Sequence, residues 1–341
     1  MGDYYGHRRR HLTKGWMIVI AVAAVLLYVG ILLGIQFVGN KLENRDAVET
    51  VGSLNGRFTS SAVTMQYNNR TWTYRDHDLT NLLLIGVDWQ DNESTVSERY
   101  AGQADFLFLI SIDRKNKIVQ TLHIDRDTMT DIRIYGPFGD YTGVQTEQIC
   151  LSYAYGKDDK TNCANTVWAV SNLLGGIPID GYLSLDMSSI ALINDTLGGV
   201  TVTLDEDFSS IDPAMTKGTT LTLHGMQAQY YVRGRMGVGD GTNASRMKRQ
   251  RTFIRAAEEL LIENINKDTN YFGTFYDALS DHIITDVDRG WLINRAYECS
   301  SYARTDTASL AGSHSIGEDG FMQFNADEDA LNERLTEMFF E

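Results

Sequence analysis

The longest apolar stretch of the chain lies within its first 40 residues. Residues 17–38, MIVIAVAAVLLYVGILLGIQFV, include no charged side chain. As a helix they would be about 33 Å long at 1.5 Å per residue, which suffices to cross the hydrocarbon core of a bilayer. A cleaved signal peptide is the alternative, but its apolar part is usually only about 7–15 residues long. The pattern therefore favours an uncleaved transmembrane helix over residues 16–38.

The charges beside this stretch predict its orientation. Arg8, Arg9, Arg10 and Lys14 precede it, whereas residues 41–46 carry no net charge. The positive-inside rule places residues 1–15 in the cytoplasm and everything after the helix outside. We therefore expect a single-pass protein of the cell membrane with an extracellular C-terminal part. Residues 39–77 are polar and weakly patterned, and we expect them to form a stalk with a strand or two.

From residue 78 to residue 341 the pattern alternates between strand and helix periods. Apolar runs at 82–87 and 106–112 are typical of strands buried on both faces. A polar turn at 113–117 separates the second run from a returning strand at 118–124, so this pair is expected to form a hairpin. Further strands are predicted at 181–185 and 200–204. Helices are predicted at 146–155, 162–174, 188–197, 224–232, 245–266, 288–300 and 327–340.

This alternation predicts an α/β fold for residues 78–341. We expect a three-layer α-β-α arrangement, in which a central mixed sheet is covered by helices on both faces, preceded by one transmembrane helix. Three cysteines are too few for a disulfide framework in an extracellular domain. Cys150 and Cys163 lie in neighbouring predicted helical segments and are candidates for a single bridge.

Residues 233–255 concentrate positive charge in an acidic protein. The whole chain has a formal net charge of −15, and the part after residue 40 has 26 basic and 44 acidic residues. An acidic surface of this kind repels nucleic acid and anionic lipid headgroups, so we expect no nucleic-acid partner. The stretch nonetheless holds seven basic residues against one acid, Asp240. The basic residues are Arg233, Arg235, Arg246, Lys248, Arg249, Arg251 and Arg255.

Three of these cations, Arg246, Lys248 and Arg249, fall where the predicted helix 245–266 begins. Positive charge in a first helical turn opposes the helix dipole and is unfavourable for the helix itself. A helix N-terminus surrounded by arginines is, however, a good phosphate site. We favour an anion site here over the alternative, a solvated or salt-bridged helix face.

Short polar segments stand at predicted strand ends and helix starts, where α/β folds place their sites. They are Gly86-Val-Asp88, Gln103-Ala-Asp105, His123-Ile-Asp-Arg-Asp-Thr128, Tyr231-Val-Arg-Gly-Arg235 and Arg246-Met-Lys-Arg-Gln250. With these segments in this order, the chain resembles the LytR-CpsA-Psr family of membrane-anchored cell-wall glycopolymer transferases. The resemblance extends from about residue 78 to residue 341. Other matching segments are NLLLIGVD (81–88), ADFLFLISIDRKNK (104–117), LLGGIPIDGYLSLD (173–186) and LHGMQAQYYVRGR (223–235).

The resemblance implies a function. In that family the domain holds a polyprenyl-pyrophosphate-linked glycopolymer and passes the phosphoglycosyl unit to a hydroxyl of peptidoglycan, with Mg²⁺ on the pyrophosphate. We therefore expect an Mg²⁺-dependent phosphotransferase of a Gram-positive-type envelope, with the lipid-linked polymer, peptidoglycan and the membrane as partners. The alternatives are a catalytically weak or inactive binding module for such polymers and a membrane-tethered pyrophosphatase. A transcriptional regulator is disfavoured because the arginines face away from the cytoplasm.

The resemblance also implies roles for individual residues. Asp88 and Asp105 correspond to metal-side carboxylates, which suits the preference of Mg²⁺ for carboxylate and phosphate oxygens. The arginine of the family's strand-end Pro-Arg-Asp corresponds to Arg126. As the base that deprotonates the acceptor hydroxyl, Asp127 and Asp240 are the candidates. The residues expected to bind pyrophosphate are Arg126, Arg233, Arg235, Arg246, Arg249 and Gln250.

The chain departs from the family pattern at several polar positions. Gln90 and Gln103 stand where the resemblance leads us to expect arginines, and Gln148 and Cys150 where it leads us to expect a lysine and an asparagine. A hydrogen bond to a charged group contributes about 1.5–3 kcal/mol, roughly twice a neutral one. These replacements leave three alternatives for the site: it binds pyrophosphate more weakly, it takes a differently charged polymer, or it has lost activity. Among the seven histidines, His123 is expected to fill a strand position rather than bind zinc.

Overall fold

The computed structural model describes residues 63–88, 102–136, 139–235 and 237–341. All of them belong to one compact unit, Gly52–Glu341. The predicted cytoplasmic tail, transmembrane helix and most of the predicted stalk lie outside the described residues, as does Gln90. Among the residues that are described, no helix has the length and apolar character needed to cross a bilayer.

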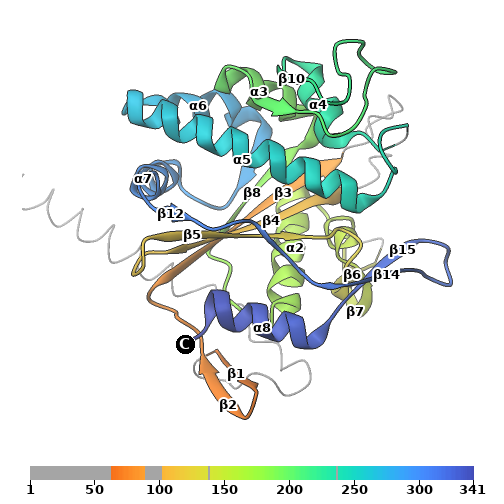
Figure 1. The fold of residues 1–341 in the computed structure, drawn as a ribbon. Coiled ribbons are helices and arrows are strands. Elements are labelled where there is room, and N and C mark those ends of the chain that lie inside the picture. Colours follow the sequence, from red (N-terminus) through yellow and green to blue (C-terminus); the bar gives the residue numbers. More distant parts are fainter. Residues whose placement is uncertain (1–62, 89–101, 137–138, 236) are drawn as a thin grey trace, which may run out of the picture. The chain divides into compact units, whose positions relative to one another are not determined.

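A seven-stranded mixed sheet forms the centre of the domain (Figure 1). β3 pairs with β4 and β4 with β5 in antiparallel fashion, whereas β3 and β8 are parallel. The β4–β5 connection confirms the hairpin expected from the polar turn, in which Lys117 has a positive φ of 55°. The order across the sheet is β11 (Ile283–Thr285), β8 (Gly181–Asp186), β3 (Leu79–Asp88), β4 (Gln103–Asp113), β5 (Ile118–Ile124) and β12 (Ala303–Arg304), with β13 (Ala308–Ser309) also on β5.

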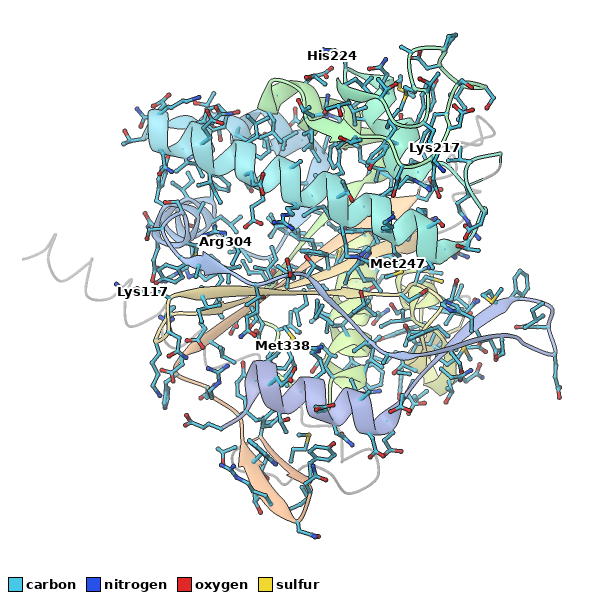
Figure 2. All side chains as sticks on the ribbon, viewed as in Figure 1. Lys117, Lys217, His224, Met247, Arg304 and Met338 are labelled. Carbon is cyan, nitrogen blue, oxygen red and sulfur yellow. The ribbon has the colours of Figure 1, made fainter. Side chains whose placement is uncertain are left out.

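Helices cover both faces of this sheet (Figure 1). Successive strand residues point to opposite faces, so Leu83 packs in one core and Leu82 in another. Met338 and Met247 are buried in the two helical layers on opposite sides of the sheet (Figure 2). One layer comprises α2 (Asp159–Leu173) and α8 (Glu328–Phe339). The other comprises α3 (Ile190–Leu197), α4 (Met226–Arg233), α5 (Asn243–Lys267), α6 (Tyr271–Leu279) and α7 (Arg289–Cys299).

Most predicted helices lie within a few residues of their observed positions, because capping residues fix their starts. Asp158, Thr242, Asp288 and Asp327 each accept a hydrogen bond from a backbone N–H in the first turn of α2, α5, α7 and α8. Helix α6 and strand β11 were not predicted. The strand predicted at 200–204 is β9 (Thr201–Thr203), which pairs with β10 (Thr220–Thr222) outside the central sheet.

The helix predicted at 146–155 is wrong over residues 146–148. Residues Tyr141–Gln148 form β7, which pairs antiparallel with β6 (Met129–Tyr135), and only Ile149–Tyr153 forms a short 3₁₀ helix. Strand β7 is largely exposed, so it lacks the apolar alternation by which a half-buried strand is recognised. A second exposed hairpin, β14 (Gly312–Ile316) with β15 (Met322–Ala326), was missed for the same reason.

Residues 63–77 of the predicted stalk belong to the folded domain. β1 (Thr64–Tyr67) and β2 (Arg70–Thr73) form a hairpin that was foreseen only as a strand or two. Met65 is fully buried in the core beside α8, and Tyr74 bridges to Phe340 near the end of the chain. The stalk interpretation fails for residues 63–77 because Met65 is buried in the core and Tyr67 and Trp72 pack against it.

His123 occupies a strand position in the core, as expected. Its ring packs against those of Phe106 and Phe108, with centroid distances of 5.0 and 5.8 Å. Burial, and secondarily the charges of Arg251 and Arg246, lower the pKa of His123 to about 3. The unfolded chain takes up a proton at this residue near pH 6.5, whereas the folded chain does not. Stability is therefore lost as the pH falls from about 6.5 towards 3.

We expect the His123→Leu variant to lack this dependence on pH. Between pH 7 and pH 5 the wild-type free energy of unfolding should decrease by roughly 2 kcal/mol more than that of the variant. Urea unfolding of both proteins at the two pH values measures the difference. Equal decreases in the two proteins would contradict the assignment of His123 as a buried neutral side chain.

Candidate functional site

The candidate site lies at one end of the sheet, where β3 ends, β4 begins and β5 ends. Asp88, the last residue of β3, pairs with Gln103, the first of β4. The register shifts next to this pair: Val87 is opposite Ala104 but Gly86 is opposite Phe106, so Asp105 is the extra residue of a β-bulge. Bulges commonly redirect a side chain next to a site. The end of the sheet therefore carries a carboxylate on each of two neighbouring strands.

Arg126 follows β5 and contacts four side chains of this region. It forms an ion pair with Asp105, and its Nη2 donates to Gln103 Oε1 at 2.5 Å. Its Nε lies 3.3 Å from Asp127 Oδ1, and its Nη2 lies 3.3 Å from Cys150 Sγ. Arg126 is mostly buried, so its guanidinium group is held in one position at the end of the sheet.

Arg246 reaches the same carboxylate from the start of α5. Its Nη1 lies 3.4 Å from Asp105 Oδ2, and its Nη2 donates to Asn243 Oδ1 at 2.7 Å. Burial lowers the pKa of Arg246; the charge of Asp105 opposes this effect, while the nearby guanidinium groups of Arg126 and Arg235 add to it. Three cations thus lie close enough to repel one another, with Asp105 between two of them. An anion bound between these guanidinium groups would relieve their mutual repulsion.

Arg233 and Arg235 place two further guanidinium groups at the same end of the sheet. Arg233 Nη2 lies 2.5 Å from Asp88 Oδ1, and both side chains are about one-third exposed. Arg235 is exposed and close enough to Asp127 to lower its pKa. It also lines an open hollow together with Asp240 and the glycines of the loop before α5. The structure therefore brings together Arg126, Arg233, Arg235 and Arg246.

Arg249 does not join this group. Its side chain is only 1% exposed, and each of its nitrogens has a protein partner. Nε donates to Tyr231 O at 3.0 Å, Nη2 to Gly234 O, and Nη1 pairs with Glu206. The expectation that Arg249 binds pyrophosphate is therefore wrong in this structure. Arg249 lies three residues after Arg246. Its side chain is on the inner side of α5, where it binds the end of α4.

Gln250 is a different case. It is 1% exposed, and neither its Nε2 nor its Oε1 has a hydrogen-bond partner among the described residues. It stands four residues after Arg246 and therefore on the same side of α5. A buried amide without partners is costly, at about 1–3 kcal/mol per unsatisfied group. The structure thus leaves this amide available for a further partner, and its role in pyrophosphate binding stays a prediction.

The two candidate bases differ in their surroundings. Asp127 is buried, and its pKa is raised first by burial and then by Asp125, while Arg126, Arg235 and Arg246 oppose the shift. Asp240 is exposed, and hydrogen bonds from Ser245 and Thr242 lower its pKa to about 2. Asp240 Oδ1 accepts from the Thr242 backbone N–H at 2.9 Å, so this carboxylate shapes the loop before α5. Asp240 is the weaker base of the two.

Behind the arginines lies a hydrogen-bonded network that the sequence did not indicate. Asp125 is 6% exposed; its Oδ1 accepts from Asn243 Nδ2 at 2.7 Å and from the Asp127 backbone N–H at 2.9 Å. Its Oδ2 lies 3.0 Å from Nε2 of His314 in the β14–β15 hairpin. Asn243 stands one turn before Arg246, a spacing that could have drawn attention to it. Nothing in the sequence relates His314 to Asp125, 189 residues earlier.

The positions that depart from the family pattern have distinct surroundings. Gln103 and Cys150 both contact Arg126, whereas Gln148 donates to Met322 O at 2.5 Å and so fastens β7 to the β14–β15 hairpin. The proposed Cys150–Cys163 bridge is absent, because all three cysteines are free. Cys163 lies instead beside Tyr153.

The two candidate metal ligands are each occupied by arginine. Asp88 pairs with Arg233, and Asp105 with Arg126 and Arg246. Within the described ranges, no cluster of three or more His, Cys, Asp or Glu side chains could hold a metal by protein ligands alone. Asp88 and Asp105 fit Mg²⁺ only in the form in which one or two carboxylates and substrate phosphates complete its coordination.

Fold and site together define a class of protein: an α/β domain with a mixed sheet whose end carries arginines and carboxylates suited to a phosphate-containing anion. The LytR_cpsA_psr family model matches residues 42–339. The chain therefore belongs to the LytR-CpsA-Psr family, and the resemblance inferred from its motifs is confirmed.

Several characterised proteins are similar to the chain. It is 28% identical over 275 residues to the polyisoprenyl-teichoic acid–peptidoglycan teichoic acid transferase TagU of Bacillus licheniformis, covering 77% of this chain and 78% of that protein. The crystal structure of Bacillus subtilis TagV matches with a TM-score of 0.58 at 24% identity, over 76% of this chain and 97% of that one. TagT bound to LI-WTA matches with a TM-score of 0.58 at 21% identity, over 77% and 90%. The structural matches show that the fold is shared.

The surroundings of the arginines predict unequal effects of substitution on stability for two of them. Arg249→Met leaves Glu206 and two backbone carbonyls without their buried partner, so we expect the free energy of unfolding to fall by about 3–5 kcal/mol. Arg235→Met removes an exposed side chain and should change stability by no more than about 0.5 kcal/mol. Urea unfolding without ligand measures both values, and a similar loss in the two variants would contradict this division.

Proposed function

We propose that this protein transfers a glycopolymer from a polyprenyl-pyrophosphate carrier to a hydroxyl of peptidoglycan on the outer side of the membrane. The observation that carries the proposal is the convergence of Arg126 and Arg246 on Asp105, beside the Arg233–Asp88 pair. Relatives named as teichoic acid–peptidoglycan transferases support it. The apolar residues 16–38, flanked by Arg8, Arg9 and Arg10, would hold the domain at the membrane surface where such a carrier resides.

Binding of the pyrophosphate would proceed by exchange of ionic partners. Without substrate, Asp88 and Asp105 neutralise the arginines; with substrate, the phosphate oxygens take over the guanidinium groups. Planar guanidinium groups match phosphate oxygens two hydrogen bonds at a time. The carboxylates released in this exchange would hold Mg²⁺, which when bound would neutralise charge on the pyrophosphate. Arg126, fixed by Asp127 and Cys150, would keep its orientation during the exchange.

Phosphoryl transfer requires charge neutralisation and alignment more than covalent assistance. Arg126, Arg233, Arg235 and Arg246 would stabilise the charge that develops on the leaving polyprenyl phosphate. Asp127 is the better proton acceptor of the two candidate carboxylates, but Arg126 Nε already lies against its Oδ1. Asp240 combines a pKa of about 2 with full exposure, and it contributes chiefly to the shape of the loop.

A weakly catalytic or inactive binding module is the second candidate. It is favoured by one observation: Arg126 Nη2 donates to the neutral amide of Gln103, at a position where the resemblance leads us to expect a further arginine. One cation fewer at the pyrophosphate would weaken binding and transition-state stabilisation together. The two functions share their ligand and differ in turnover.

The first test is the removal of the central cation. We expect Arg126→Ala to weaken the binding of a polyprenyl-pyrophosphate-linked disaccharide by about 10- to 100-fold and to abolish its transfer to peptidoglycan. Arg255→Ala is the matched control, because Arg255 is 73% exposed on the outer side of α5. The full-length protein in detergent micelles, with Mg²⁺ and with EDTA, serves for both measurements. Transfer that survives both Arg126→Ala and EDTA would reject the proposal.

The second test restores the cation expected from the resemblance. Gln103→Arg adds a guanidinium group beside Arg126, and we expect it to increase affinity for the same pyrophosphate probe by about tenfold. Gln66→Arg adds the same charge at an exposed position of β1 and should leave affinity unchanged. Equal affinities of the Gln103→Arg variant and the wild type would show that Gln103 does not face the anion.

A further inference from the structure

His314 and Asp125 form a dyad beside the arginine site. Asp125 Oδ1 already accepts two hydrogen bonds, from Asn243 Nδ2 and from the Asp127 backbone N–H, and its Oδ2 faces His314 Nε2 at 3.0 Å. Among the described residues, no arginine or lysine pairs with Asp125, so the imidazole is its only potentially cationic partner.

The geometry determines which nitrogen of His314 can act as a base. A carboxylate can only accept hydrogen bonds, so Nε2 of the neutral ring carries the hydrogen and donates it to Asp125. The lone pair is then on Nδ1, to which no described residue donates a hydrogen bond. The side chain is 36% exposed, and the ring of Phe324, with its centroid 4.9 Å away, restricts the orientation of the imidazole. A base oriented by a carboxylate with its other nitrogen accessible is the arrangement that activates hydroxyl nucleophiles.

The dyad is connected to the phosphate-binding groups. Asn243 donates to Asp125 and accepts from Arg246 Nη2 at 2.7 Å. One amide thus fixes the position of Arg246 relative to the dyad. Arg126 is the next residue in the chain after Asp125. The backbone N–H of Phe324 donates to Asp127 O at 2.7 Å, which fixes the β14–β15 hairpin against this segment. The N-terminal end of α5 and this hairpin lie at the same end of the sheet (Figure 1).

We propose that His314 is the general base that removes the proton from the acceptor hydroxyl, with Asp125 as its positioning residue. The proposal rests on the proposed transferase function. It deepens that function by assigning the acceptor side of the site to the β14–β15 hairpin. Neither carboxylate suggested by the sequence is suited to this step, because Asp127 is paired with Arg126 and Asp240 is a weak base.

The step balances as follows. The acceptor oxygen forms a bond to the phosphorus next to the glycopolymer, and the proton of the hydroxyl passes to His314 Nδ1. The bond between this phosphorus and the bridging oxygen breaks, and its electron pair leaves with the polyprenyl monophosphate. The product is a phosphodiester between the glycopolymer and the acceptor, and the imidazolium returns its proton to solvent.

The experiment separates transfer from binding in the full-length protein in detergent micelles. The donor is a synthetic polyprenyl-pyrophosphate-linked disaccharide, and the acceptor is a soluble peptidoglycan fragment. We expect His314→Ala to lower the single-turnover rate of transfer on the order of 100-fold while donor affinity stays within about twofold. His282→Ala, which truncates an exposed histidine outside the site, is the matched control and should transfer at the wild-type rate.

Chemical rescue provides a readout that a merely structural role would not give. Added imidazole should raise the transfer rate of His314→Ala at least tenfold and leave that of His282→Ala unchanged. Transfer by His314→Ala within twofold of the wild type would overturn this inference alone, as would a parallel loss of donor affinity and transfer without rescue. Wild-type protein that binds the donor without transferring it would overturn both this inference and the proposed transferase function.

Discussion

The placement of one carboxylate between two guanidinium groups determines how the rest of the site is built. Asp105 pairs with Arg126 and Arg246, which come from the end of β5 and the start of α5. All three side chains are largely buried, and a buried cation is tolerable only with an opposite charge beside it. The β-bulge of β4 brings Asp105 to this position, and the start of α5 must lie over the end of the sheet for Arg246 to reach it. A local irregularity of one strand thus lies in contact with the start of a helix, through a residue 141 positions later in the chain.

Two kinds of arginine follow from this arrangement. Arg246 and Arg249 are three residues apart on α5, yet one faces the anion site and the other is enclosed by α4. The enclosed arginine donates to backbone carbonyls and pairs with Glu206, so its charge is neutralised within the protein. The first shares the carboxylate of Asp105 with Arg126 and lies close to Arg235, an arrangement in which a polyanion is a favourable partner. Some basic residues of the 233–255 stretch therefore stabilise the fold, and others form the candidate anion site.

The exposed hairpins have more influence on the site than their sequences suggest. The Gln148 side chain at the end of β7 donates to Met322 O, and the backbone N–H of Phe324 in β15 donates to Asp127 O, next to Arg126. His314 is brought to Asp125 by the same hairpin. The donor side of the reaction is thus built by strands and helices of the central domain, and the acceptor side, in our proposal, by a hairpin near the C-terminus.

The sequence by itself determined the elements whose signals are local. The buried strands, the β4–β5 turn, the capped helices and the Asp88, Asp105, Arg126 and Arg246 motifs could all be predicted from patterns within a few residues. Only the tertiary structure decided which cation of the basic stretch turned inward, as Arg249 does, because burial depends on what packs against a helix rather than on its own sequence. The same holds for the exposed hairpins, for the separation of Cys150 from Cys163, and for the meeting of Asp125 with His314. Those contacts join segments far apart in the chain. No local pattern encodes which distant residue will pair with a buried charged side chain.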